Sequence, residues 1–500
     1  MIRIILLTAY FIIPQFGRTQ SGMNVFDDSY IHEIRLTFTD PDYWDTLLVH
    51  YDAVYDSNPP DFDLKQYVLA SFVEIDGVVL DSVGFRIKGL TSSGISSSKR
   101  KHFKVDFGEF KDWKFDGLRK LNLSNTYSDG TMLRDALAYD LLRSLSIPAP
   151  RTSYFKLYLN NEYWGLYVAI EQVDKEFLEN YFVQPHGNLY KPFFRNALSW
   201  HGQDWAMYED TMELRTNEGT LYHSELLDFI EFINTAPDGE FLAGIGEVLD
   251  FDKALTQLAV DYIIGNGDSP FIQGRNYFIY ADQFHGKVKL IPWDFNFSFN
   301  SGVELIQDFA IILGFDTVPR NIFRSRLQTI PAARQVLLNR VCEIAQSFTP
   351  EYLNSIIDPK IALIRDELIL EPHQANWMPH SNNSLSNLVQ ALKNFIQSNG
   401  NRINGDLSDE GFWCYLGSDD HDEPDFSVAP NPAVDVIRLR TGFSIDKLTV
   451  VNSLGELILM LSNIDPGMTE INCSRIETGF YYLIIESDGQ VDRVKFEKMK

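Results

Sequence analysis

The stretch from Asn266 to Asn296 reads NGDSPFIQGRNYFIYADQFHGKVKLIPWDFN. It holds Asp268 in a Gly-rich turn and then Asn276, and two short runs of strand-forming residues follow, NYFIY and KVKLI, with a turn at HGK between them. This pattern predicts a two-stranded hairpin that ends at Asp294. Because a hairpin brings its two ends together, we expect Asp268, Asn276 and Asp294 to lie close to one another.

Two carboxylates and one amide at the ends of short β elements suit a particular chemistry. One acid can lie beside a reacting hydroxyl while the other lies on a phosphate that carries Mg²⁺. Asp and Asn are also common turn residues, so the spacing alone leaves a purely structural role open for all three side chains. The flanking sequence therefore has to separate a catalytic hairpin from an ordinary one.

The length and composition of the chain indicate a folded protein of more than one domain. It has 500 residues, of which 45% are hydrophobic and 13% aromatic, enough to build two or three domains with large cores. The formal net charge of −26 gives an average surface that repels nucleic acids and anionic lipids. We therefore expect no nucleic-acid partner, and a polyanionic ligand would need a local basic pocket or a metal ion.

Three cysteines, Cys342, Cys414 and Cys473, are far apart in the sequence and form no C-x-x-C pair. This spacing predicts neither a zinc site nor a disulfide framework. We expect them to be small buried or half-buried residues, with a single bridge left open as an alternative.

The N-terminal segment has the features of a secretory signal. Arg3 supplies a short positive region, residues 4–13 form an apolar run too short to span a bilayer, and a break follows at Pro14 and Gly17. We interpret residues 1–20 as a cleaved signal peptide, with a buried N-terminal strand as the alternative. No later stretch is long and apolar enough to cross a membrane, so we expect an exported mature chain without a transmembrane segment.

Periodicity predicts a β-rich first part and a mainly helical second part. Residues 31–38 are expected to form an edge strand, residues 131–145 a long helix, and Gly89–Ser98 a flexible loop. Residues 305–400 are expected to be mostly helical, and an acidic linker follows over residues 401–425. Further short strands are expected at residues 68–75, 78–80, 84–88, 99–107, 120–123, 154–159 and 166–171.

A set of motifs occurs in a fixed order over most of the first three hundred residues. They are FRIKGLTSS (85–93), KRKHFKVDF (99–107), GLRKLNLSN (117–125), MLRDALAYDLLR (132–143), NNEYWGLYVAIEQVDKEFL (160–178), GNLYK (187–191), RNYFIY (275–280) and IPWDFN (291–296). Taken together, they resemble the CotH kinase family, the secreted kinases related to spore coat protein H.

This resemblance implies an α+β domain over residues 25–400 with an atypical protein-kinase-like two-lobe fold. The small lobe would cover about residues 65–172 and the large lobe about residues 173–400, with ATP in the cleft between them. The implied activity is transfer of the γ-phosphate of ATP to Ser or Thr of exported or surface proteins.

The resemblance also implies roles for the residues of the opening stretch. Asp268 is the candidate catalytic acid, which orients or deprotonates the acceptor hydroxyl. Asp294 and Asn276 are candidate ligands of Mg²⁺ (or Mn²⁺), a hard ion that favours oxygen donors. Two residues after the metal-binding Asp, members of the family often carry a second acid; here that position is Asn296, which keeps an oxygen donor but loses a charge.

Positive groups are implied at the phosphates of ATP. Lys88, before the Gly/Ser-rich loop, and Lys104, on the strand after it, are equal candidates for the nucleotide lysine, and Lys191 is another candidate phosphate contact. Glu171 is a candidate acidic partner of that lysine or a nucleotide-contacting group at the lobe junction, and Asp135 is an alternative partner. The loop could cover phosphates with backbone N–H groups, although it is not a G-x-G-x-x-G loop.

The block of short, evenly spaced strands over residues 426–500 predicts a small all-β sandwich. Its motifs are VAPNPAVDVIRL (428–439), VVNSLGELI (450–458), ETGFYYLIIES (477–487) and VKFEK (494–498). They resemble the C-terminal sorting domain of the type IX secretion system of Bacteroidetes. This implies the type IX secretion machinery as a partner and a secreted or cell-surface location; an ordinary binding module is the alternative.

Three functions remain open at this point. The first is a secreted CotH-like kinase. The second is a catalytically weak or inactive surface, structural or adhesion protein with the same fold, which Asn296 and the absence of a G-x-G-x-x-G motif favour. The third is a carbohydrate-active enzyme, in which two carboxylates hydrolyse a glycosidic bond.

Overall fold

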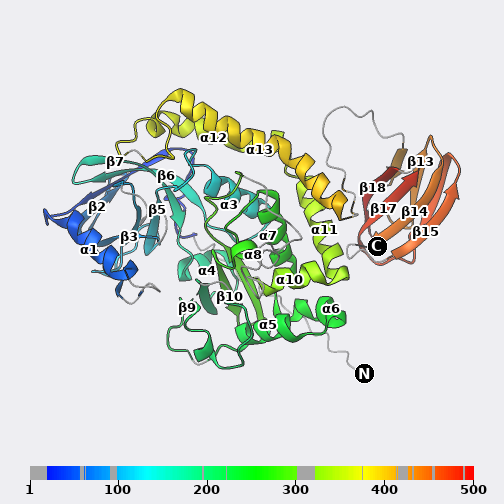
Figure 1. The fold of residues 1–500 in the computed structure, drawn as a ribbon, viewed down its shortest axis with the longest axis horizontal. Coiled ribbons are helices and arrows are strands. Elements are labelled where there is room, and N and C mark those ends of the chain that lie inside the picture. Colours follow the sequence, from blue (N-terminus) through cyan, green and yellow to red (C-terminus); the bar gives the residue numbers. More distant parts are fainter. Residues whose placement is uncertain are drawn as a thin grey trace, which may run out of the picture.

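The computed structural model mixes helices and sheets and ends in an all-β unit (Figure 1). It describes residues 20–499 with the exception of residues 57–60, 62–63, 90–97, 194–195, 221, 301–320, 374, 411, 413, 415–425, 431–432, 453–456 and 488–489. The predicted signal peptide, most of the predicted loop Gly89–Ser98 and the most acidic part of the predicted linker therefore lie outside the described residues.

Seven strands of the first part form a closed barrel in the order β1-β2-β3-β4-β5-β7-β6. The strands are β1 (Ile31–Thr37), β2 (Val68–Ile75), β3 (Val78–Lys88), β4 (His102–Asp106), β5 (Lys120–Ser124), β6 (Thr152–Leu159) and β7 (Glu162–Glu171). The prediction of an edge strand at residues 31–38 is wrong. β1 pairs with β2 on one side and in parallel with β6 on the other, and a closed barrel has no edge.

An apolar interior holds the barrel together. In β1, Ile34 and Leu36 are fully buried and alternate with more exposed residues, so every second side chain of the strand faces inward. Aromatic rings fill much of the interior; Phe85 and Phe103, for example, stack with their centroids 4.8 Å apart. Helix α1 (Tyr43–Tyr55) packs against β2 and β3, and its Leu47 and Tyr51 belong to the same apolar core. Burial of one large aliphatic side chain, such as that of Ile34 or Leu36, contributes about 1.5–3 kcal/mol to the free energy of folding.

The long helix predicted at residues 131–145 is confirmed as α3 (Arg134–Ser144). It begins later than predicted because the carboxylate of Asp129 accepts hydrogen bonds from the backbone N–H groups of Thr131, at 3.0 Å, and Arg134, at 2.9 Å. α3 packs on β6, and its apolar side chains belong to the core of the second part. The helix therefore joins the barrel to the helical part of the molecule (Figure 1).

The second part is built around a four-stranded sheet in the order β11-β10-β8-β9. Its strands are β8 (Asn188–Pro192), β9 (Met212–Leu214), β10 (Tyr277–Asp282) and β11 (Lys287–Pro292). The predicted hairpin is confirmed, because β10 and β11 pair antiparallel with Tyr277 opposite Pro292. This register puts the residues just before β10 and those just after β11 at the same end of the sheet.

Helices surround this sheet, and α5, α6 and α7 contact β11 directly. The helices of this part are α4 (Lys175–Tyr181), η2 (Trp205–Met207), α5 (Ser224–Thr235), α6 (Asp238–Val248), α7 (Phe251–Ile263), α8 (Pro270–Gln273), α10 (Ile322–Thr329), α11 (Pro331–Ala345), α12 (Pro350–Leu368) and α13 (Asn382–Asp409). The predicted helical character is confirmed for the described residues after 320, and α13 also includes residues 401–409 of the predicted linker. No helix in the described part of the chain is long and apolar enough to span a membrane.

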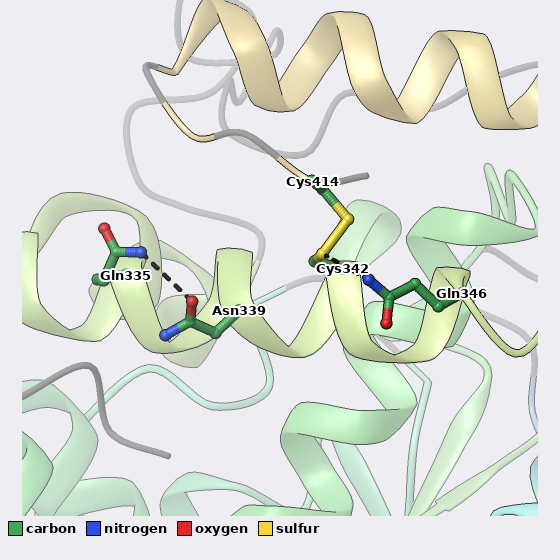
Figure 2. The surroundings of a disulfide bond; sticks show 5 residues. All are labelled: Gln335, Asn339, Cys342, Gln346 and Cys414. Carbon is green, nitrogen blue, oxygen red and sulfur yellow. Dashed lines mark hydrogen bonds between the residues drawn. A yellow bond between two sulfur atoms is a disulfide. The ribbon is translucent and has the colours of Figure 1, made fainter. Parts of the chain in front are cut away.

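A disulfide joins Cys342 on α11 to Cys414, which follows α13 (Figure 2). The two cysteines are 72 residues apart in the sequence, so the bridge ties the end of this part back onto α11. The Nε2 of Gln346 lies 3.7 Å from the Cys342 sulfur. This is the single bridge that the sequence left open, and Cys473 is a free, buried thiol as expected.

The C-terminal unit is all β, as predicted. Its strands are β12 (Phe426–Ala429), β13 (Val436–Thr441), β14 (Ile445–Asn452), β15 (Leu457–Ile464), β16 (Gly467–Asn472), β17 (Gly479–Ser487) and β18 (Gln490–Lys498). They form one sheet in the order β12-β13-β16 and a second in the order β15-β14-β17-β18. One apolar core, with Ile437 from the first sheet and Leu448 and Leu483 from the second, is shared by both sheets.

Candidate active site

The turn that carries Asp268 is fixed by hydrogen bonds to the end of α7. Asn266 folds back onto the helix: its backbone N–H donates to the Asp261 carbonyl at 2.8 Å, and its Nδ2 donates to the Asp261 carboxyl at 2.7 Å. Burial raises the pKa of Asp261 to about 8, so this carboxyl is mostly protonated at neutral pH. The Oδ1 of Asn266 in turn accepts from the Asp268 backbone N–H at 3.3 Å, and Ser269 then caps α8.

The Asp268 carboxylate is held on both oxygens. Its Oδ1 accepts from Arg275, at 2.8 Å from Nη2 and 3.1 Å from Nε, and its Oδ2 accepts from the Nδ2 of Asn276 at 2.8 Å. Asn276 has a φ of 64°, in the left-handed region that Asn tolerates better than most residues. Its Nδ2 also donates to the Asp268 carbonyl at 3.0 Å, which leaves Oδ1 as the atom of Asn276 that can accept a cation.

Asp294 follows β11 and also lies in the left-handed region, with a φ of 64°. Such a conformation costs a non-Gly residue about 1–3 kcal/mol and persists only where its surroundings fix it. Here α3 fixes it. The Asp294 backbone N–H donates to the Tyr139 hydroxyl at 3.0 Å, and the Phe295 N–H donates to the Asp135 carboxyl at 2.7 Å. The guanidinium of Arg134 donates to the next carbonyl, that of residue 296, at 3.0 Å.

At this point one carboxylate raises the pKa of a second carboxyl group, and the second raises the pKa of a third. Burial, and then the negative charge of Asp268, raises the pKa of Asp294 to about 6. Burial, and then the charge of Asp294, raises the pKa of Asp135 to about 8. Asp135 and Asp294 therefore resist being ionised together, and around neutral pH the proton is on Asp135. Added positive charge beside Asp294 would favour its ionised form.

Two lysines approach the aromatic residue that follows β11. The Nζ of Lys88, at the end of β3, lies 5.3 Å from the centre of the Trp293 ring and donates to the Oδ1 of Asn122 at 3.0 Å. The Nζ of Lys191, on β8, lies 5.7 Å from the same ring. Burial, and then the charge of Lys191, lowers the pKa of Lys88 to about 7, and burial, followed by Arg215, lowers the pKa of Lys191 to about 8. Two half-buried amines held this near each other favour, once protonated, an anion beside them.

Lys104 lies next to this pair but is already engaged. It is opposite Asn122, the partner of Lys88, in the β4–β5 register, and its Nζ donates to the Oε1 of Gln172 at 2.6 Å. Burial, and then the charge of Lys88, lowers its pKa well below the ordinary value. Of the two candidates for the nucleotide lysine, Lys88 is the one whose charge acts on Asp294.

Glu171 is placed elsewhere. Its carboxylate accepts from Arg151, at 2.6 Å from Nη2 and 3.0 Å from Nε, and from the Arg151 backbone N–H at 3.1 Å. Asn180 and Tyr181 complete its surroundings. Among the contacts of the described residues, Glu171 is thus bound by an arginine, in place of the lysine that the sequence suggested as its partner. Its side chain is 1% exposed, which leaves little surface for a ligand.

Asn296 has one satisfied and one unsatisfied polar atom. Its Nδ2 donates to the Tyr127 carbonyl at 3.0 Å, whereas its Oδ1 is buried without a hydrogen-bond partner among the described residues. A buried acceptor of this kind calls for a water, a donor or a cation. The position therefore still offers an oxygen donor two residues after Asp294.

The residues present fit a hard divalent cation held partly by substrate phosphates. No group of three or more His, Cys, Asp or Glu side chains in the described part of the chain could enclose a metal on its own. Mg²⁺, however, usually keeps several waters and takes one or two carboxylates together with phosphate oxygens. Asp294, the Oδ1 of Asn276 and the orphaned Oδ1 of Asn296 are oxygen donors of this class.

Several residues of this arrangement were not predicted from the sequence. They are Arg275, Asn122, Tyr139 and Trp293. Arg275 lies within the quoted stretch, next to Asn276, so a charged residue beside a candidate ligand was a visible signal. Trp293 also lies within it, directly before Asp294. Asn122 and Tyr139 act from distant parts of the chain, and Tyr139 could have been noticed only as the residue one helical turn after Asp135.

Two family models match the chain. The CotH kinase protein model matches residues 85–403, and the secretion-system C-terminal sorting domain model matches residues 427–497. The inner spore coat protein H of Bacillus subtilis is 24% identical over 314 residues, which is 61% of this chain and 83% of the relative. Spore coat protein homolog 1 of Rhizopus delemar is 21% identical over 222 residues, 42% of this chain but only 36% of that protein.

Among solved structures, the twitchin kinase region of C. elegans is similar over 80% of this chain and 70% of its own, at 10% identity and a TM-score of 0.22. This score is too low to support an argument about the fold. The sorting domain supports secretion and a cell-surface location. Because the first model covers more than half of the chain, the protein belongs to the CotH kinase protein family and carries a type IX C-terminal sorting domain.

Proposed function

We propose that the protein is a secreted kinase that transfers the γ-phosphate of ATP to Ser or Thr of exported or surface proteins. The observation that carries this proposal is that two lysine amines and two carboxylates lie close to one another. Lys88 and Lys191 converge on Trp293, and the next residue, Asp294, is close enough to Asp268 for the charge of Asp268 to raise the pKa of Asp294. A polyphosphate needs the cations, and phosphate transfer to a hydroxyl needs the acids.

Each residue has a role in this proposal. Asp268, oriented by Arg275 and Asn276, would accept a hydrogen bond from the acceptor hydroxyl and take its proton as the phosphate is transferred. Lys88 and Lys191 would bind phosphate oxygens, and the added negative charge would restore their protonation.

A divalent cation would be held by Asp294 with Asn276 and Asn296. It would supply positive charge to the phosphates.

The same proposal assigns a role to each of the two parts of the domain. The barrel would act as the small lobe and the helical part as the large lobe of a kinase-like fold, because Lys88 comes from the barrel and Asp268 and Asp294 come from the helical part. ATP would lie between them. Residues 1–20 would direct the chain to export, and the type IX machinery would recognise the sorting domain.

The test is transfer of labelled phosphate from ATP to a mixture of exported proteins by the purified chain, with Mg²⁺ and then with Mn²⁺. The variant Asp268→Asn should lower transfer by about 100-fold or more at unchanged folding. Asp366→Asn, which changes an exposed carboxyl on α12, is the matched control and should leave transfer unchanged. If the folded wild-type protein and Asp268→Asn are equally inert with both metals, the kinase proposal fails.

One observation favours a second candidate, a catalytically weak surface or adhesion protein. The position of the second family acid is Asn296, whose amide nitrogen is already bound to Tyr127. The metal site then has one fewer charge than is common in the family. Saturable binding of ATP with Mg²⁺ that Asp294→Asn abolishes would argue against this candidate, and a glycan-release assay covers the carbohydrate-active alternative.

A further inference from the structure

A cavity of about 820 Å³ lies outside the candidate active site. It is formed by the segment that leads through η2 and β9 to the start of α5. Its lining includes Asp204, Trp205, Glu209, Glu218, Tyr222 and His223. This volume is in the range of pockets that bind small molecules or the side chains of a peptide.

The cavity and the candidate active site lie on opposite faces of one sheet. Met212 and Leu214 of β9 line the cavity, and Glu213 lies between them. Because successive side chains of a strand point to opposite faces, Glu213 points away from the cavity. On that other face it is opposite Lys191 in the β8–β9 register, and it forms an ion pair with Lys65 at 3.5 Å. A ligand in this cavity would therefore not compete with one at Lys191.

One wall of the cavity is aromatic and rigid. Trp205 and His223 stack with their ring centroids 4.5 Å apart and their planes 12° from parallel. The Nδ1 of His223 is 2.8 Å from the hydroxyl of Tyr190, which fixes the ring from behind. Burial lowers the pKa of His223, so this ring is neutral around pH 7. Tyr222 also lines the cavity, yet it is 76% exposed, so its ring is open to a ligand.

The charged side chains of the cavity are all acidic. Asp204, Glu209 and Glu218 line it, and no Lys or Arg is found among its described lining residues. Asp204 is used to cap η2, because its carboxylate accepts from the Ala206 backbone N–H at 3.1 Å. Glu209 and Glu218 are exposed, and no ion pair in the described part of the chain involves them. The cavity thus combines aromatic faces with two exposed carboxylates that are open to a cation.

We propose that this cavity binds the cationic side chain of a basic peptide segment, an Arg or a Lys. The cation would lie against the ring of Tyr222 or Trp205 and pair with Glu209 and Glu218. In a secreted kinase the cavity would then dock the protein substrate through a basic segment, away from the Ser or Thr that is phosphorylated. The docking role rests on the proposed kinase function, whereas the binding of a basic peptide does not.

The test measures binding and transfer separately with the full chain. The probe is a fluorescein-labelled octapeptide with one serine and two arginines, and its partner has citrulline in place of each arginine, which keeps the shape and removes the charge. Fluorescence anisotropy without ATP should show that the arginine peptide binds, and that added salt weakens the binding. The double variant Glu209→Gln/Glu218→Gln should weaken binding about fivefold, and Tyr222→Ala about threefold.

The matched control separates the cavity from the overall acidity of the chain. Glu240→Gln/Glu247→Gln removes the same charge from two exposed residues of α6 and should leave the affinity unchanged. Equal weakening by both double variants would attribute binding to the net charge and would overturn the proposal. So would equal binding of the citrulline peptide, because the cavity would then not recognise the positive charge.

Phosphate transfer then distinguishes the two proposals. If the arginine peptide binds in the cavity and no peptide is phosphorylated, the binding site stands and the kinase function fails. If both peptides are phosphorylated with the same KM, and the cavity variants change neither binding nor KM, the kinase function stands and the docking site fails. The expected result is a KM for the arginine peptide that rises about fivefold in Glu209→Gln/Glu218→Gln at unchanged kcat.

Discussion

Replacing Asp294 by Asn should make the ligand-free protein more stable while it abolishes phosphate transfer. The pKa of this carboxyl is raised from 3.8 to about 6 in the folded chain, so the folded state holds the proton more tightly than the unfolded state. Ionising Asp294 therefore destabilises the folded state. The penalty builds up as the pH rises from about 4 to about 6 and is fully present at pH 7.5.

The size of the effect follows from the shift. A difference of about two pKa units corresponds to about 3 kcal/mol. Because the side chain is partly exposed to solvent, we expect about 1–2 kcal/mol. Asn keeps the shape of the side chain and removes the charge, so the midpoint of thermal unfolding at pH 7.5 should rise by about 2–4 °C. The gain should fall to about half at pH 5, where Asp294 in the folded protein is mostly protonated.

Bound nucleotide should make the wild-type protein more stable than the Asp294→Asn variant, which reverses their order without nucleotide. A non-hydrolysable ATP analogue with Mg²⁺, at 100 times its Kd, should stabilise the wild-type protein by about 2.7 kcal/mol. The Asp294→Asn variant should gain far less, because it lacks the charge that holds the cation. Asp366→Asn, the control on α12, should behave as wild type in both states. If Asp294→Asn is less stable than wild type at pH 7.5 without nucleotide, the carboxylate is a structural group and the electrostatic reasoning is refuted.

Three further substitutions test the surroundings of the site. Tyr139→Phe removes the hydroxyl that accepts from the Asp294 N–H, so transfer should fall about tenfold and the free energy of unfolding by about 1 kcal/mol, as followed by kcat and urea unfolding. Glu171→Gln should lower the free energy of unfolding by about 3 kcal/mol, because it leaves the half-buried Arg151 beside a neutral partner, and the KM for ATP should be unchanged. A raised KM at unchanged stability would restore a nucleotide role to Glu171. Cys414→Ser opens a loop of 72 residues and should lower the free energy of chemical unfolding by about 4 kcal/mol. The kcat at 25 °C should be unchanged. A loss of activity in the folded variant would show that the disulfide determines the geometry of the site.

The features that could be predicted from the sequence are those set by local pairing. The β10–β11 hairpin depends on alternating apolar residues and a short turn, so its ends, with Asn276 and Asp294, could be expected to meet. The helix of Arg134–Ser144 depends on a 3.6-residue period, and the nearby Asp129 accepts from the backbone N–H of its first residue. In each case the interacting residues are close in sequence, and the physical rule acts over a few residues.

The features that could not be predicted depend on contacts between distant segments. Closure of the barrel pairs Ile34 with Leu157, and the rules for a single strand do not identify a partner more than a hundred residues away. For Glu171 the partner is nearer in sequence, because Arg151 precedes the first strand of the β6–β7 hairpin and Glu171 ends the second. A carboxylate near the end of a strand is compatible with an arginine or a lysine partner, and only the folded arrangement decides between them.

The contact of α3 with Asp294 belongs to the same class. The spacing of Asp135 and Tyr139 puts both side chains on one face of a helix, which the sequence alone shows. It does not show that this face lies against the backbone after β11. The cavity beside Trp205 was also missed, because its walls come from a segment without strong periodicity.

The bridge between Cys342 and Cys414 has a mechanical consequence. Cys414 is the last described residue before the segment that leads to the sorting domain. Any pulling force on the C-terminal unit, for example while it is held by export machinery, would reach the rest of the chain at this residue. The disulfide would transmit that force to α11 and the helices packed against it. The C-terminal end of α13 would then not unfold first. As long as the disulfide is intact, a force on the C-terminal unit would therefore not distort the site around Asp268.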